Sequence, residues 1–205
     1  MSRPLLLIDI DGPLNPYAAK ATRRPDGYTT HRMAPASWVA RSAKPPAYVK
    51  PLRVWLNHDH GAALQALPFE LVWCTTWMAE ANEWIGPHLG LPGLPFIEFT
   101  NLHDYPADGT HWKTRTVIEW AAGRPFGWID DEINRADEEY VAKHHDGPAL
   151  LHHVHPAKGL LPGDFSVLRD WAHGLIEVPL RPTTDTELAA LPVLDLANFH
   201  AQENQ

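Results

Sequence analysis

Two acidic residues, Asp9 and Asp11, follow a run of aliphatic residues at positions 5–8, near the start of the chain. An aliphatic run of this kind predicts a strand that is buried on both faces. Because side chains alternate along a strand, the two carboxylates would lie on the same side of it. Burying ionised carboxylates is costly unless a cation pairs with them. The pair therefore indicates a site that requires concentrated negative charge.

Polar side chains also follow two later apolar runs, each of which predicts a further strand. Thr75 and Thr76 follow the first of these runs, and Asp130 and Asp131 follow the second. Lys113 lies in the first turn of the helix that we expect before the second acid pair. Because sites in parallel α/β sheets form beyond the carboxyl ends of the strands, we expect these groups to meet at one edge of the sheet.

The chemistry of this combination is that of phosphoryl transfer. Carboxylates that converge on one point repel one another unless a hard cation lies among them, and Mg²⁺ prefers oxygen ligands while keeping places for water or phosphate. A nearby lysine and a hydroxyl would neutralise and orient a phosphate. A carboxylate can act as a nucleophile toward phosphorus and form an aspartyl-phosphate, because the cation screens the two negative charges.

Strand-like runs alternate with amphipathic stretches along the chain. The expected strands are residues 4–10, 70–74, 95–99, 126–129 and 149–154, and the expected helices are residues 60–67, 78–88, 111–122, 133–144 and 164–173. This alternation predicts an α/β fold with a mostly parallel sheet and helices on both faces. Between the first two strands, residues 28–32 and 52–56 could pair as a hairpin. Residues 178–205 show no clean period, and we treat them as a tail.

The residues of the expected site follow one another in the order Asp9-x-Asp11-Gly12, Thr75, Lys113 and Asp130-Asp131. This order resembles the haloacid dehalogenase (HAD) superfamily of phosphatases, over roughly residues 4–160. The stretches "DIDGPLNP", "LVWCTTW", "HWKT" and "WIDDE" look closest to a compact, capless bacterial branch whose members begin with a "DVDGVLN"-like motif. Some relatives of that branch are fused to RNA-repair modules.

The resemblance implies a role for each matched residue. Asp9 would be the nucleophile, and Asp11 would protonate the leaving oxygen and then activate water against the aspartyl-phosphate. Thr75 would hydrogen-bond the phosphate, a role for which Thr76 competes, and Lys113 would hold both the nucleophile and the phosphate.

The resemblance also implies a cofactor and a domain layout. Mg²⁺ would be bound by Asp9, the backbone carbonyl of Asp11 and Asp130, with Asp131 in support. A three-layer Rossmann-like catalytic domain would span residues 1–177, with a squiggle-and-flap insertion at residues 14–56, just after the first strand.

The expected insertion is strongly basic. Between positions 16 and 53 the chain has eight basic side chains and one acidic one, a net charge of +7. Since the net charge of the whole chain is −8, the remaining residues carry −15. Such a cluster alone is typical of a solvated loop. The 37 residues between Thr75 and Lys113 are too few for a cap module. An active site that has no cap and lies beside a basic flap favours a sizeable or polyanionic phosphorylated substrate, such as a nucleotide or a nucleic-acid end.

Other interpretations of these residues explain less. A calcium loop that begins at Asp9 would need Gly at its sixth position and Glu at its twelfth, where the chain has Leu14 and Lys20. A receiver domain of the signalling kind has no second acid pair after its lysine. The thirteen histidines lack the spacing of a zinc site, and we expect them at the surface.

The remaining expectations concern compartment and activity. Cys74 is the only cysteine, which excludes an internal disulfide and fits a reducing compartment. With no signal-peptide pattern and no membrane-spanning segment, we expect a cytoplasmic protein without membrane contact. No protein partner is indicated. We expect a Mg²⁺-dependent phosphomonoester hydrolase, with a phosphotransferase of the same fold and a non-catalytic binding module as alternatives.

Overall fold

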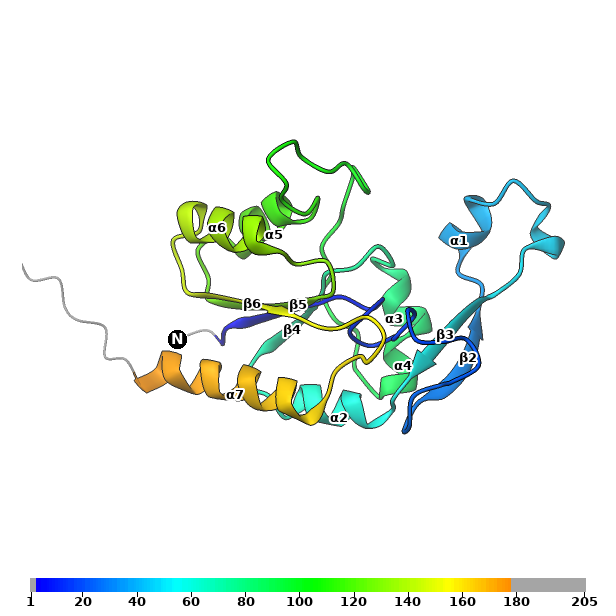
Figure 1. The fold of residues 1–205 in the computed structure, drawn as a ribbon, viewed down its shortest axis with the longest axis horizontal. Helices are drawn as coiled ribbons and strands as arrows, with labels where there is room; N and C mark the ends of the chain where they lie inside the picture. The colour runs from blue at the N-terminus through cyan, green and yellow to red at the C-terminus, as the bar shows by residue number, and fades with distance from the viewer. Residues whose placement is uncertain (1–2, 178–205) are drawn as a thin grey trace, which may run out of the picture.

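A four-stranded parallel sheet forms the centre of the computed structural model, which describes residues 3–177 (Figure 1). The strand order is β4-β1-β5-β6, made from β1 (Leu5–Ile8), β4 (Glu70–Trp73), β5 (Phe126–Asp130) and β6 (Ala149–His153). All three pairings within this sheet are parallel. The expected mixed α/β fold with a mostly parallel sheet is therefore confirmed. The predicted tail at residues 178–205 lies outside the described residues.

β1 occupies the interior of the sheet because its side chains are apolar on both faces. All four of them are fully buried, at 0% exposure. Leu6 and Ile8 pack into one hydrophobic cluster, and Leu5 and Leu7 pack into the other. Because β1 lies between β4 and β5, the residues that follow it lie in the interior of the carboxyl edge of the sheet.

Helices cover both faces of the sheet (Figure 1). On one face lie α2 (Asp59–Gln65) and α7 (Pro162–Glu177), which contribute Leu64 and Leu168 to the cluster around Leu6. On the other lie α5 (Thr114–Ala121) and α6 (Arg135–His144), which contribute Val117 and Val141 to the second cluster. Among residues 3–177, no helix is both long enough and apolar enough to cross a membrane.

The single helix expected at residues 78–88 is wrong, because two short helices occupy this segment. They are α3 (Glu80–Trp84) and α4 (Gly86–Leu89). Pro87 has no N–H to donate, so the hydrogen-bond ladder of the first helix cannot continue through it, and Pro87 instead lies in the first turn of the second helix. Gly90 ends the second helix in the left-handed conformation, with φ of 64°, which glycine adopts without steric cost.

The strand expected at residues 95–99 is also wrong. Phe96 forms only an isolated bridge with Trp73 at the edge of β4. The Trp73 N–H donates to the Pro95 carbonyl and the Ile97 N–H donates to the Trp73 carbonyl, both at 2.9 Å. Since Pro95 cannot donate, the pairing does not extend into a ladder.

The expected hairpin between the first two strands of the sheet is confirmed. β2 (Thr29–Met33) and β3 (Leu52–Leu56) pair antiparallel, with Thr29 opposite Leu56. Their connection carries α1 (Ala36–Ala40) and the 3₁₀ helix η1 (Pro46–Tyr48). Figure 1 shows this connection projecting away from the sheet. The hairpin is attached to the body through buried apolar residues such as Val54.

His60, on α2, is a buried histidine that sequence reasoning expected at the surface. It is 6% exposed, and its ring contacts those of Tyr28 and Phe165 at centroid distances of 5.6 and 5.5 Å. Within the described residues its Nδ1 atom has no hydrogen-bond partner. Burial lowers the pKa of His60 to about 4, against the opposing charges of Asp59 and Asp164.

This buried ring gives a testable pH dependence of stability. Above pH 6.5 the imidazole is neutral in both states, whereas below it the unfolded chain binds a proton that the folded chain does not take up until about pH 4. The free energy of unfolding therefore decreases as the pH falls from 6.5 to about 4, by about 3 kcal/mol over the whole range. The substitution His60→Phe removes this loss, which urea unfolding at pH 7 and pH 4.5 measures. The same change at the exposed His153 is the control, and equal pH dependence in all three proteins would contradict the assignment.

Candidate active site

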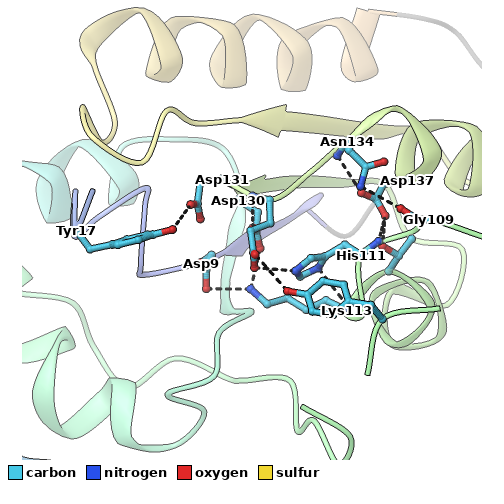
Figure 2. Close-up of polar contacts among 12 residues, drawn as sticks. Asp9, Tyr17, Gly109, His111, Lys113, Asp130, Asp131, Asn134 and Asp137 are labelled. Atoms are coloured by element: carbon cyan, nitrogen blue, oxygen red, sulfur yellow. Dashed lines mark hydrogen bonds and ion pairs between the residues drawn. The ribbon is translucent and has the colours of Figure 1, made fainter. Parts of the chain in front are cut away.

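Lys113 lies between two aspartates at the carboxyl edge of the sheet (Figure 2). Its Nζ atom is 3.0 Å from Oδ1 of Asp9 and 2.7 Å from Oδ2 of Asp130. Asp9 follows β1, Asp130 ends β5, and these neighbouring strands are in register with Ile8 opposite Ile129. The sheet thus brings together two acids that are 121 positions apart in the sequence.

The cluster is buried, so its charges act strongly on one another. Asp9 is 6% exposed, Lys113 is 2% exposed and Asp130 is fully buried. Burial alone would lower the pKa of Lys113, but the charges of Asp130 and Asp9 outweigh it and hold the pKa well above its usual value. Burial also raises the pKa of Asp9 well above its usual value, and the positive charge of Lys113 offsets this only in part. Burial therefore outweighs the stabilisation that Lys113 gives to the ionised form of Asp9.

Asp131 adds a third carboxylate to this cluster. Oxygen atoms of Asp9, Asp130 and Asp131 all lie within 4.8 Å of one another, a spacing that could hold a metal ion. Burial and the neighbouring charge of Asp130 raise the pKa of Asp131 to about 6. The Tyr17 hydroxyl donates to Oδ2 of Asp131 at 3.1 Å and fixes its orientation (Figure 2). These residues fit a hard divalent cation, because all three offer carboxylate oxygens.

Two hydrogen bonds orient the carboxylate of Asp11. Nδ2 of Asn15 donates to one oxygen at 2.7 Å, and the indole Nε1 of Trp77 donates to the other at 2.9 Å. The side-chain oxygen of Asn15 in turn accepts the backbone N–H of Trp55, on β3, at 3.0 Å. Sequence reasoning assigned no role to either donor, although Asn15 lies in the stretch "DIDGPLNP" and Trp77 ends the stretch "LVWCTTW".

Gly12 permits the close approach of the two acidic loops. It adopts a left-handed conformation with φ of 99°. A Cβ atom at this position would lie 2.4 Å from the carboxylate of Asp131, closer than any side chain allows. The glycine in the DxDG stretch is therefore required both by backbone geometry and by its neighbour.

The two threonines differ in their access to the site. Thr75 is buried at 1% exposure, and its hydroxyl accepts the backbone N–H of Trp77 at 3.4 Å. Thr76 instead lines a pocket of about 240 Å³ together with Asp9, Asp11 and Lys113. In this structure Thr76 therefore lines the pocket, whereas the hydroxyl of Thr75 supports the loop.

Asp137 fixes the start of the helix that follows Lys113. Its Oδ1 atom accepts the backbone N–H of His111 at 2.6 Å and the hydroxyl of Thr114 at 2.5 Å. Its other oxygen accepts the backbone N–H of Asn134, whose own side chain caps α6 (Figure 2). The spacing of Asn134 and Asp137 is that of a capping box, which is the signal that could have identified both residues.

His111 is a second buried histidine that the sequence analysis expected at the surface. Its Nε2 atom lies 3.0 Å from Oε2 of Glu132, and this hydrogen bond lowers the pKa of Glu132. Tyr105 donates to the other oxygen of Glu132 at 3.2 Å. His111, Asp130 and Glu132 form another group whose spacing could hold a metal ion. The site therefore continues past Asp130 toward the loop that carries Tyr105.

Comparisons of the chain with protein-family models, with curated proteins and with solved structures find no match. The fold and the site define a mixed α/β protein with a buried acidic cluster that could hold a metal ion. The function of the protein therefore has to be argued from the chemistry of its site residues.

Replacing Lys113 tests whether the buried acids depend on its charge. In Lys113→Met the carboxylates of Asp9 and Asp130 face each other without a cation, so we expect a loss of about 3–5 kcal/mol at pH 7.5. The loss shrinks at pH 5, because protonation then relieves the repulsion. Urea unfolding at both pH values measures this. The control Arg135→Met breaks an exposed pair with Glu139 and changes stability little, and an equally small effect at Lys113 would contradict the analysis.

Proposed function

We propose that the protein is a Mg²⁺-dependent phosphomonoester hydrolase of the HAD type that acts through an aspartyl-phosphate. One observation carries the proposal. Lys113 lies between Asp9 and Asp130 at the carboxyl ends of neighbouring parallel strands, with a carboxylate oxygen of Asp131 within 4.8 Å of theirs. Asp11 lines the same pocket as Asp9 and Lys113 and supplies a further carboxylate, which Asn15 and Trp77 orient.

The residues that would hold Mg²⁺ are Asp9, Asp130 and Asp131. The raised pKa values of Asp9 and Asp131 support this role, because burial and the charge of Asp130 disfavour both ionised carboxylates and a bound cation would stabilise them. When bound, the cation would screen the negative charges of nucleophile and phosphate. We place the backbone carbonyl of Asp11 in the same ligand set on the family resemblance alone.

Hydrolysis would proceed in two displacements on phosphorus. An oxygen of Asp9 attacks the phosphorus, the ester P–O bond breaks, and Asp11 gives its proton to the leaving oxygen. Asp11 then takes a proton from water, which attacks the same phosphorus and breaks its bond to Asp9. Inorganic phosphate leaves, and both carboxylates return to their starting state. Lys113 would orient the Asp9 oxygen throughout, and Thr76, which lines the same pocket, would contact the phosphate.

Release of phosphate from p-nitrophenyl phosphate tests the proposal. We expect turnover with Mg²⁺, none after chelation with EDTA, and recovery when Mg²⁺ is restored. Asp9→Asn lowers kcat by at least about a thousandfold, because the covalent route is lost. Asp170→Asn, an exposed change on α7, is the matched control and keeps wild-type activity.

The alternatives give different results in the same assay. Turnover that appears only when an alcohol or sugar acceptor is added identifies a phosphotransferase. If a broad panel of phosphoesters gives no metal-dependent turnover, the hydrolase proposal is wrong and a binding module is favoured.

The orientation of Asp11 gives a separate prediction. Trp77→Phe keeps an aromatic ring but removes the indole N–H that donates to Asp11. We expect kcat to fall about tenfold with little change in KM, the size expected for one hydrogen bond to a charged group. Trp120→Phe, on α5 and only partly buried, is the control. An unchanged kcat in Trp77→Phe would show that this hydrogen bond does not position the acid.

A further inference from the structure

A second pocket, of about 740 Å³, lies beside the candidate active site. Its lining includes four basic side chains and one acidic one: Lys20, Arg23, Arg24, Lys158 and Asp26. A concentration of positive charge is notable in a chain whose total charge is −8. Its volume is in the range of ligand pockets.

The walls of this basic pocket come from two segments that are distant in the sequence. One is the chain after β1, and the other is the loop after β6, which lie side by side in Figure 1. The Ala18 N–H donates to the Pro156 carbonyl at 3.2 Å, and the Leu160 N–H donates to the Pro13 carbonyl at 2.8 Å. These backbone hydrogen bonds hold the two walls together, so the pocket is part of the fold.

The basic pocket and the active site share one edge of the sheet. Tyr17 lines the active-site pocket, and the next residue, Ala18, lines the basic pocket. On the other wall, β6 pairs with β5 so that His153 lies opposite Asp130, and Lys158 follows five positions later. A substrate with its end at Asp9 could therefore continue into the basic pocket past the half-exposed ring of Tyr17.

The structure divides the basic residues of the insertion into two groups. Lys20 and Arg23 line the pocket, and within residues 3–177 neither side chain forms a hydrogen bond or an ion pair, so both charges are available to a ligand. Lys44 and Lys50 are also exposed, but they lie in the connection between β2 and β3, outside the lining of this pocket. The two pairs have equal charge and differ in position.

We propose that the basic pocket binds the backbone phosphates of a phosphate-terminated oligonucleotide whose terminal phosphate lies at Asp9. The inference rests on the proposed function and names its substrate class. Four cations exceed what a single phosphate monoester needs, whereas a chain of phosphates uses them together. The exposed face of Tyr17, between the two pockets, suits stacking by a base.

The test compares two charge-matched double variants on substrates of different length. Lys20→Glu/Arg23→Glu alters the basic pocket, and Lys44→Glu/Lys50→Glu changes the net charge equally elsewhere on the insertion. The substrates are p-nitrophenyl phosphate, a nucleoside triphosphate, and oligothymidylates of about ten nucleotides with a 5′- or a 3′-phosphate. We expect the pocket variant to raise KM for an oligonucleotide at least tenfold and to leave p-nitrophenyl phosphate unchanged. The control variant leaves KM for both within about threefold.

Salt dependence provides a second readout. Each phosphate contact on a single strand contributes about 0.7 to the slope of log affinity against log salt concentration, so losing two contacts reduces that slope by about 1.4. Equal losses in both double variants would reflect net charge alone and would overturn the proposal, as would no loss in either. A change in KM confined to the nucleoside triphosphate would overturn the oligonucleotide assignment.

Binding separates this inference from the proposed activity. Fluorescence anisotropy with a labelled, phosphorylated oligothymidylate measures affinity whether or not the wild-type protein releases phosphate. Selective weakening by Lys20→Glu/Arg23→Glu in an inactive protein would support the pocket and contradict the hydrolase. Hydrolysis of p-nitrophenyl phosphate without selective weakening would contradict the pocket and support the hydrolase.

Discussion

The buried ion cluster of Asp9, Lys113 and Asp130 is the constraint on which the site depends. It joins the ends of β1 and β5 to the start of α5, and its charges are almost completely removed from water. Three desolvated charges persist only when their geometry is held closely, because a displaced partner would leave another uncompensated. The cluster is also unbalanced, since Asp131 brings a third carboxylate to one ammonium. The excess of negative charge makes the cluster a suitable place for a cation.

The supporting contacts show how this geometry is maintained. Asp137 accepts hydrogen bonds from the segment on either side of Lys113, so the lysine is held from its helix as well as from its charge partners. Asn15 and Trp77 hold Asp11, and Gly12 leaves room for Asp131. Most of these supports come from loops at the carboxyl edge, whereas Asp9 and Asp130 are fixed by neighbouring strands and Lys113 by the start of α5. A rigid sheet thus defines the position of the site, and the loops define the orientation of each group.

Much of the fold could be predicted from the sequence, because burial leaves a strong pattern. The aliphatic run at β1 and the acids at the ends of β1 and β5 predict the sheet and the meeting of Asp9 with Asp130. The places where a proline interrupts an expected helix or strand were harder to predict. Pro87 divides the helix expected at 78–88, and Pro95 limits a strand to one bridge. The contacts of Trp77 with Asp11 and of Asn15 with Trp55 join residues that are 66 and 40 positions apart, so no local spacing encodes them. The buried His60 likewise owes its place to the packing of α2 against Tyr28 and Phe165.

Asn15 has a consequence that reaches beyond the orientation of one carboxylate. Its amide nitrogen holds Asp11, and its amide oxygen holds the main chain of β3 at Trp55. A single planar group therefore ties the projecting hairpin to the residue proposed to transfer protons. If a large ligand tilts that hairpin, the amide must rotate or break one of its two contacts. Ligand binding at the hairpin, far from the phosphorus atom, would in this way change the orientation of Asp11. The rate of turnover would then depend on what the hairpin contacts.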